Sequence, residues 1–131
     1  MIHEGQLTYA ELGLAKTLDL GEWWLLETGL PLPLGVNVVR RSLGGEVIEA
    51  LSGVLRASIR SGLEHRDEAM AYALRFGRGI ELGLADRFVD MYVNELTQDL
   101  GGEGRTAVEE LLRRAEATGA YEVPVRVEFA P

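Results

Sequence analysis

The change of architecture predicted for this chain falls within residues 28–45, which read Thr-Gly-Leu-Pro-Leu-Pro-Leu-Gly-Val-Asn-Val-Val-Arg-Arg-Ser-Leu-Gly-Gly. Pro31 and Pro33 exclude a helix in the first part of this stretch and favour an extended edge conformation. Three valines then predict a strand from Gly35 to Arg41, because branched side chains suit the pleated surface of a sheet. The glycine pair that follows marks the point where the extended pattern gives way to a helical one.

The segment before this stretch predicts one more strand and a short helix. Leu14–Leu18 alternates as a short strand does, and Asp19 opens a capping-box pattern at the start of the helix. Trp23 and Trp24 are adjacent and cannot share one helical face. One of them is therefore expected to pack, and the other to lie at an interface or a cleft edge.

Four helices are predicted after residue 44. The first has an apolar face with helical spacing, formed by Val47, Ile48, Leu51, Val54, Leu55 and Ile59. The others are expected near residues 67–76, 81–93 and 103–118. Residues 123–129 alternate between apolar and polar side chains, which predicts an extended tail lying against a neighbour.

Composition sets limits on the size of the protein and on its partners. A chain of 131 residues with 47% hydrophobic residues is long enough for one domain, which buries about two-thirds of its extended surface. The formal net charge of -8 argues against nucleic acid and against anionic membranes as partners.

Residue counts also restrict the chemistry and the compartment. The chain has no cysteine, which excludes disulfides and thiolate metal sites, and its two histidines do not predict a histidine-rich metal centre. We therefore expect no metal site. The N-terminus lacks a signal-peptide pattern, and no apolar run approaches the roughly 18 residues that span a bilayer. These features favour a cytoplasmic protein.

Four motifs together carry a family resemblance. They are Ile2-His3-Glu4-Gly5-Gln6-Leu7-Thr8-Tyr9, Asp19-Leu20-Gly21-Glu22-Trp23-Trp24, Thr28-Gly29-Leu30-Pro31-Leu32-Pro33-Leu34-Gly35 and Asn37-Val38-Val39-Arg40-Arg41. They resemble the C-terminal half of 1,4-dihydroxy-6-naphthoate synthase, a lyase of menaquinone biosynthesis in the futalosine pathway. The resemblance covers essentially the whole chain and is densest from Ile2 to Leu43.

The resemblance implies a fold of the α/β class. Residues 1–131 would form a single region that resembles half of a two-lobed synthase, with part of a periplasmic-binding-protein-like (type II) fold. A few strands in a cleft segment, residues 1–43, would precede about four helices and an extended tail, residues 44–131.

The resemblance also implies an activity and a set of site residues. Such an enzyme converts cyclic dehypoxanthine futalosine to 1,4-dihydroxy-6-naphthoate, with His3 as the general base and without a cofactor. Imidazole suits this role because its ordinary pKa lies close to neutral pH. Pro33, Leu34 and Gly35 would wall the substrate pocket, and the groups that bind the substrate carboxylate would lie in the other half.

Other interpretations remain open for these residues. His3 would otherwise be an N-terminal histidine without a role, and residues 33–35 a stiff segment that only packs. Arg40 and Arg41 either attract a carboxylate or form a solvated strand end. For His65, a surface or capping role is expected.

Three hypotheses follow for the chain as a whole. The first is a synthase fragment with little or no activity unless another chain supplies the missing N-terminal lobe. The second is a small-molecule binding module without catalysis. The third is a truncated product that forms a homo-oligomer, in which a second copy covers its exposed apolar faces.

Overall fold

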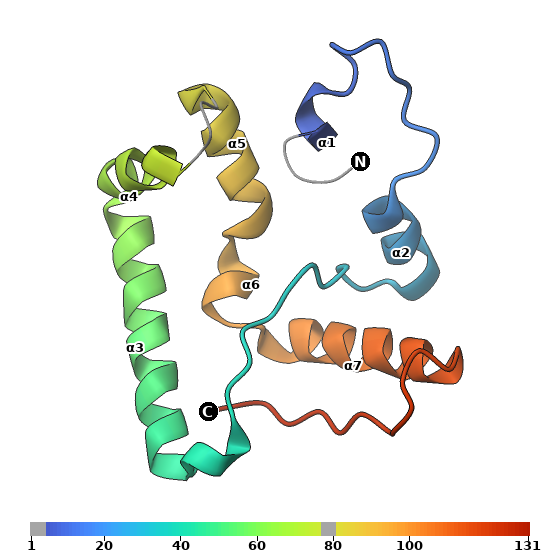
Figure 1. Ribbon diagram of the computed structural model, residues 1–131, viewed down its shortest axis with the longest axis vertical. Coiled ribbons are helices and arrows are strands. Elements are labelled where there is room, and N and C mark those ends of the chain that lie inside the picture. Colours follow the sequence, from blue (N-terminus) through green and yellow to red (C-terminus); the bar gives the residue numbers. More distant parts are fainter. Residues whose placement is uncertain (1–4, 77–80) are drawn as a thin grey trace. The chain divides into compact units, whose positions relative to one another are not determined.

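The computed structural model describes residues 5–76 and 81–131, and the regular structure within these residues is helical (Figure 1). In chain order the elements are α1 (Gly5–Thr8), α2 (Leu20–Thr28), η1 (Arg41–Leu43), α3 (Gly45–Glu64), α4 (Arg66–Ala73), η2 (Leu74–Phe76), α5 (Leu82–Tyr92), α6 (Glu95–Gln98) and α7 (Gly101–Ala117). The two η elements are single 3-10 turns. The segments before α2, between α2 and η1, and after α7 run without regular secondary structure.

The predicted strands are wrong. Across residues 5–76 and 81–131 no strand forms, so the α/β class and the periplasmic-binding-protein-like fold are not supported. A strand exists only through hydrogen bonds to a neighbouring strand. Leu14 instead donates its N–H to the carbonyl of Tyr9 in a local turn at 3.1 Å. Residues 35–40 run without regular secondary structure and lead into the 3-10 turn η1 at Arg41. Alternating side chains indicated that these segments favour an extended backbone, but an extended backbone alone does not make a sheet.

The helical predictions are confirmed. The apolar pattern after residue 44 is the 20-residue helix α3, and the second and third predicted helices correspond to α4 with η2 and to α5. The last predicted helix is α7. The glycine expected to end the second helix, Gly77, lies outside the described residues.

Helix α2 begins and ends as its sequence predicts. The Oδ1 atom of Asp19 accepts hydrogen bonds from the N–H groups of Gly21 and Glu22, at 2.9 and 3.2 Å. These bonds satisfy two of the amides that a helix leaves unpaired at its start. Gly29 ends the helix with a φ of 70°, which costs a residue without Cβ little. Of the two tryptophans, Trp24 is 3% exposed and Trp23 is 44% exposed, so one packs as expected.

The chain divides into two compact units, each of which has a small core. The first comprises residues 1–18 and 55–98, and the second comprises residues 19–54 and 99–131. In the second unit α2 contributes buried Trp24, and α7 contributes Gly104, Ala107 and Val108. The guanidinium of Arg114 on α7 lies 5.1 Å from the centre of the Trp24 ring. A cation–π contact therefore joins the two helices that form this core.

The first unit is held by a charged cluster beside a core of two residues, Met70 and Ala85. Arg66, at the start of α4, donates to Oδ1 of Asp86 on α5 from Nε at 3.0 Å and from Nη2 at 2.7 Å. The same Nη2 lies 2.6 Å from Oδ1 of Asp90, one turn further along α5. The hydrogen bond to Asp86 is the main reason that the pKa of Arg66 is raised. One guanidinium thus connects two helices.

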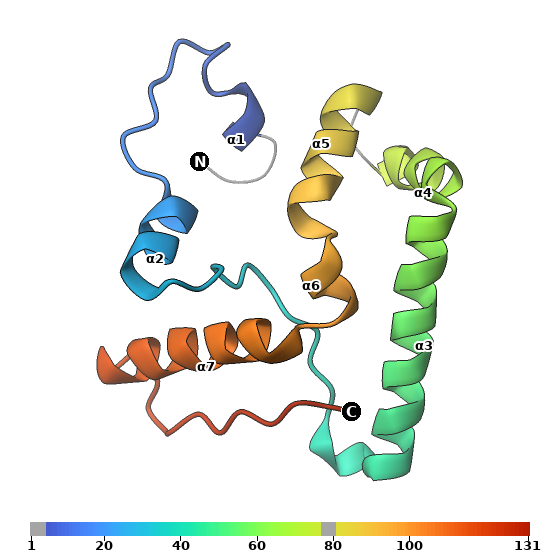
Figure 2. The same ribbon diagram turned by 180° about the vertical axis from the view of Figure 1, so that it is seen from behind.

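Helix α3 is the longest helix among the described residues, and none of its residues is buried. Figures 1 and 2 show it as one continuous helix from both sides. Its residues up to Val54 group with the second unit, and those from Leu55 group with the first. The apolar face predicted from the sequence is therefore present, and none of its side chains is buried.

Candidate functional site

The catalytic residue predicted from the sequence, His3, lies outside the described residues. Its role as general base stays a prediction that rests on the motif around it. The structure describes the chain from Gly5 onward, where α1 forms a single turn.

The predicted substrate-binding residues lie in the irregular segment between α2 and η1. Pro33 is half-buried, whereas Leu34 is 60% exposed and Gly35 is exposed. A Cβ atom added to Gly35 would meet no heavy atom within 4 Å. Within the described residues, the backbone at Gly35 thus faces open space, and Leu34 has little packing. This stretch is accessible to a ligand, and packing alone does not account for its sequence.

The direction of this segment is set where it leaves α2. The hydroxyl of Thr28 donates to the carbonyl of Trp24 at 2.8 Å and accepts from the N–H of Leu30 at 3.1 Å. A hydroxyl that bonds on both sides of a helix end satisfies groups left open there. Thr28 thereby ties the start of the Leu-Pro-Leu-Pro run to buried Trp24, so the predicted site segment begins at the core of the second unit.

Of the two arginines that follow, one binds a carboxylate of the chain itself. Arg41 donates from Nε to Oε2 of Glu128 and from Nη2 to the carbonyl of Arg126, both at 2.9 Å. The tail also contacts α7, because the guanidinium of Arg105 lies 5.1 Å from the centre of the Phe129 ring. The expectation that the tail lies against a neighbour is confirmed, and Arg41 serves to hold it.

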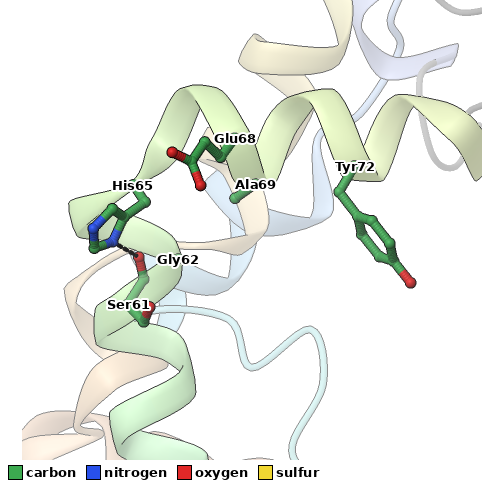
Figure 3. Close-up of a pocket in the computed structure, with 6 residues that line it drawn as sticks. All are labelled: Ser61, Gly62, His65, Glu68, Ala69 and Tyr72. Carbon is green, nitrogen blue, oxygen red and sulfur yellow. Dashed lines mark hydrogen bonds between the residues drawn. The ribbon is translucent and has the colours of Figure 1, made fainter.

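A shallow depression of about 430 Å³ lies on the first unit, at the end of α3 and along α4 (Figure 3). It is lined by Ser61, Gly62, His65, Glu68, Ala69 and Tyr72. Nδ1 of His65 lies 3.0 Å from the carbonyl oxygen of Ser61. Because a carbonyl only accepts, this contact places a proton on Nδ1 and leaves Nε2 of a neutral ring as an acceptor.

The depression does not provide an enclosed site. His65 and Glu68 are both exposed, and the Tyr72 side chain, 61% exposed, projects from α4 at the far end of the group (Figure 3). A general base gains most where water is excluded and the substrate is held. The surface role expected for His65 is confirmed.

Among the described residues, the largest resolved shift in pKa is that of Glu110 on α7. Glu110 accepts from Nε and Nη2 of Arg113, both at 2.8 Å, and from Nε of Arg114 at 2.7 Å. These bonds, with Arg113 the larger cause, lower the pKa of Glu110 from 4.5 to about 2. The i,i+4 spacing of the sequence predicts pairs of Glu110 with Arg114 and of Glu109 with Arg113. The first pair forms, whereas Arg113 donates to Glu110 instead. Arg114 also contacts Trp24, so this cluster supports the core rather than forming a site for chemistry.

The described residues contain neither a group of metal ligands nor a membrane-spanning helix. Residues 5–76 and 81–131 contain no group of three or more histidine, cysteine or acidic side chains placed to hold a metal ion. Among the helices of the same residues, none has both the length and the apolarity that crossing a membrane requires.

Comparison with known proteins identifies the family of this chain, which the geometry of the described residues does not. The family model described as menaquinone biosynthesis matches residues 1–117 of this chain. The chain belongs to this menaquinone biosynthesis family. Two 1,4-dihydroxy-6-naphthoate synthases are similar to it over 91% of its length, one from Streptomyces coelicolor at 40% identity and one from Thermus thermophilus at 41%.

A solved structure also resembles this member of the family. The crystal structure of an Archaeoglobus fulgidus protein matches 92% of the chain with a TM-score of 0.85 and 44% identity. The chain spans less than half of each of these proteins, namely 42% of the Streptomyces synthase, 44% of the Thermus synthase and 46% of the Archaeoglobus chain. More than half of each of these proteins therefore lies outside the match.

Proposed function

We propose that this chain is the portion of a 1,4-dihydroxy-6-naphthoate synthase that carries the general base and one wall of the substrate pocket. The observation that carries the proposal is the identity of 40% and 41% with two synthases over 91% of the chain. The reaction is the carbon–carbon cleavage that converts cyclic dehypoxanthine futalosine to 1,4-dihydroxy-6-naphthoate.

In this proposal His3 removes the proton that starts the cleavage. Neutral imidazole is a suitable base near pH 7, because its ordinary pKa allows it both to accept and to release a proton there. The assignment follows the motif Ile2-His3-Glu4 and is supported by the composition, since only one other histidine occurs in the chain. That histidine, His65, lies exposed on a shallow surface.

Pro33, Leu34 and Gly35 form the pocket wall. The exposure of Leu34 and Gly35 and the open space beside Gly35 support this role, because a ligand can approach the backbone closely there. Binding of the substrate carboxylate is assigned to the portion of the synthase outside the match. The net charge of -8 is consistent with this division, since the chain by itself repels an anion.

The chain alone is expected to have little or no synthase activity. A displacement of about 1 Å between a catalytic group and its substrate can lower the rate roughly 100-fold. A pocket with one wall neither positions the substrate nor excludes water. The activity requires the polypeptide that makes up the rest of the related synthases.

The test compares the same substitution at the two histidines. The chain is combined with the unmatched portion of the Thermus thermophilus synthase, and formation of the naphthoate from cyclic dehypoxanthine futalosine is followed by absorbance. We expect His3→Ala to lower turnover at least 100-fold while substrate binding is kept, and His65→Ala to leave turnover unchanged. Full turnover by His3→Ala would exclude the assigned base. Substrate binding without product in every combination would favour a binding module instead.

A further inference from the structure

The stretch that carries the proposed pocket wall, residues 30–35, is attached to α2 through the side chain of Thr28. The hydroxyl of Thr28 donates to the carbonyl of Trp24 at 2.8 Å and accepts from the N–H of Leu30 at 3.1 Å. Across residues 5–76 and 81–131, no hydrogen bond other than those with Thr28 reaches residues 30–35. One side chain of the same compact unit therefore holds this stretch by hydrogen bonds.

The backbone at the end of α2 leaves the N–H of Leu30 without a backbone acceptor. Gly29, at a φ of 70°, donates its own N–H to the carbonyl of Leu25 at 2.8 Å. This single bond is the αL ending of a helix, in which the N–H that follows is not taken up. Pro31 comes next and has no N–H, so Leu30 is the last donor before the proline run. The hydroxyl of Thr28 accepts from that donor.

The run after Leu30 is stiff, so its direction is decided where it begins. Pro31 and Pro33 fix their own φ angles, and each restricts the residue before it to extended conformations. An extended proline-rich run advances about 3.1 Å per residue, so a change of about 10° in direction at Leu30 moves Gly35 by roughly 3 Å. Residues 30–33 are half-buried, whereas Gly35 is exposed. The exposed end of the wall therefore follows the orientation set at Leu30.

We propose that Thr28 is a positioning residue, whose hydroxyl holds the pocket wall in the orientation that binds the substrate. It acts through the backbone of Leu30. The proposal rests on the proposed function for the identity of the wall and of the substrate, and it adds the side chain that orients the wall. Its role differs from that of His3, because loss of the hydroxyl weakens binding of the substrate, whereas loss of the imidazole stops proton transfer.

Three variants of the full 131-residue chain test this role. Thr28→Val keeps the shape of the side chain and removes the hydroxyl, whereas Thr28→Ser keeps the hydroxyl. Thr106→Val is the matched control, because the Thr106 hydroxyl also donates to a carbonyl four residues earlier, that of Gly102 at 2.9 Å, but lies within α7 and away from the helix end. Each variant is combined with the unmatched portion of the Thermus thermophilus synthase, and kcat and KM are measured with cyclic dehypoxanthine futalosine.

We expect Thr28→Val to raise KM by about fivefold or more and to change kcat by less than about twofold, because the wall contributes to binding and not to proton transfer. Thr28→Ser should restore KM to within about twofold of the unmodified chain, and Thr106→Val should leave both constants unchanged. A threonine that only stabilised the fold would lower kcat with the amount of folded protein and leave KM unchanged. That pattern overturns the proposal, as do equal KM values for Thr28→Val and Thr106→Val.

A second measurement, on the chain alone, separates this proposal from the proposed function. In NMR spectra the shift of the Leu30 amide should depend weakly on temperature in the unmodified chain, as for a hydrogen-bonded N–H, and strongly in Thr28→Val. The order parameters of the Leu34 and Gly35 amides should fall in that variant and not in Thr106→Val.

The two measurements fail separately. If the unmodified combination makes no naphthoate, the proposed function fails, and the amide signals still decide whether Thr28 orients residues 30–35. Unchanged signals of Leu30, Leu34 and Gly35 in Thr28→Val overturn the positioning role even where turnover is normal.

Discussion

Helices α3 and α7 are the two longest helices of the chain, and they differ in what covers them. Both are amphipathic in sequence. Helix α7 has 17 residues and buries Gly104, Ala107 and Val108, whereas α3 has 20 residues and buries none. The covered helix lies in the same unit as Trp24 and binds its ring through Arg114.

The difference between α3 and α7 shows that the formation of an amphipathic helix and the burial of its apolar side are separate properties, although one sequence pattern suggests both. Spacing of three and four residues predicts that a helix forms and which side is apolar. It does not predict whether the covering surface belongs to the same stretch of chain. For α7 a single large aromatic side chain from α2 supplies part of that surface. For α3 the pattern is equally regular, but none of its residues is buried.

The largest effect that this comparison predicts is at Trp24. Replacement of Trp24 by alanine should lower the free energy of unfolding by about 3–5 kcal/mol, because it empties the space between α2 and α7. The same type of truncation on α3, Val54→Ala, should change it by less than about 0.5 kcal/mol, because that side chain is 66% exposed. Urea unfolding followed by circular dichroism measures both.

Trp24→Phe is the matched control for the aromatic volume. The indole N–H of Trp24 is buried and has no hydrogen-bond partner within the described residues. A buried donor without a partner costs about 1–3 kcal/mol, so its removal offsets part of the loss of ring volume. Trp24→Phe should therefore retain most of the stability that Trp24→Ala loses. Equal effects of Trp24→Ala and Val54→Ala would show that the second unit has no core of its own.

The sequence predicted local structure well wherever the physical cause was local. Asp19 and Gly29 bound α2 through hydrogen bonds and backbone geometry that a few neighbouring residues determine. The strands at 14–18 and 35–41 were wrong because pairing depends on a distant segment, which alternation cannot report. The apolar face of α3 was predicted correctly as a pattern, but the pattern does not predict that none of its side chains is buried.

The candidate site was predictable only through resemblance. Nothing in composition or spacing distinguishes His3 from His65, and it is the surrounding motif that assigns a role to the first. The contact between Arg114 and Trp24 was missed, because a basic residue on a polar helix face carries no signal of the aromatic ring it will meet. Adjacent tryptophans did signal that one of them is buried, and Trp24 is.

A smaller effect is expected at the start of α2. Asp19→Ala removes the acceptor of two backbone N–H groups and should lower the free energy of unfolding by about 1 kcal/mol. Because α2 carries Trp24, loss of the cap should destabilise the covered core and leave exchange of the α3 amides unchanged. Asp19→Asn, which also caps well, is the control. Hydrogen exchange in α2, α3 and α7 provides the measurement, and faster exchange confined to α3 would contradict this account.

The smallest effect concerns the polar side of α7 and depends on pH. The pKa of Glu110 is lowered from 4.5 to about 2 by its hydrogen bonds to Arg113 and Arg114, so the carboxylate stabilises the folded state above about pH 4.5. This contribution declines as the pH falls from 4.5 through about 2, and below that pH the group is protonated in both states. Glu110→Gln should therefore be less stable than the unmodified chain near pH 7 and converge with it near pH 2.

Glu109→Gln is the control for the loss of one negative charge, since Arg113 donates to Glu110 instead. Thermal unfolding from pH 2 to 7 should show the convergence for Glu110→Gln alone. Arg114 links Glu110 to the Trp24 ring. The pH-dependent stability difference caused by Glu110→Gln should therefore persist when it is measured in the Trp24→Phe background and become smaller in the Trp24→Ala background. This result would show that the ion pair acts through the core around Trp24. Identical profiles for both glutamine variants would instead mean that the effect reflects net charge, and the polar side of α7 would then stabilise the chain no more specifically than that of α3.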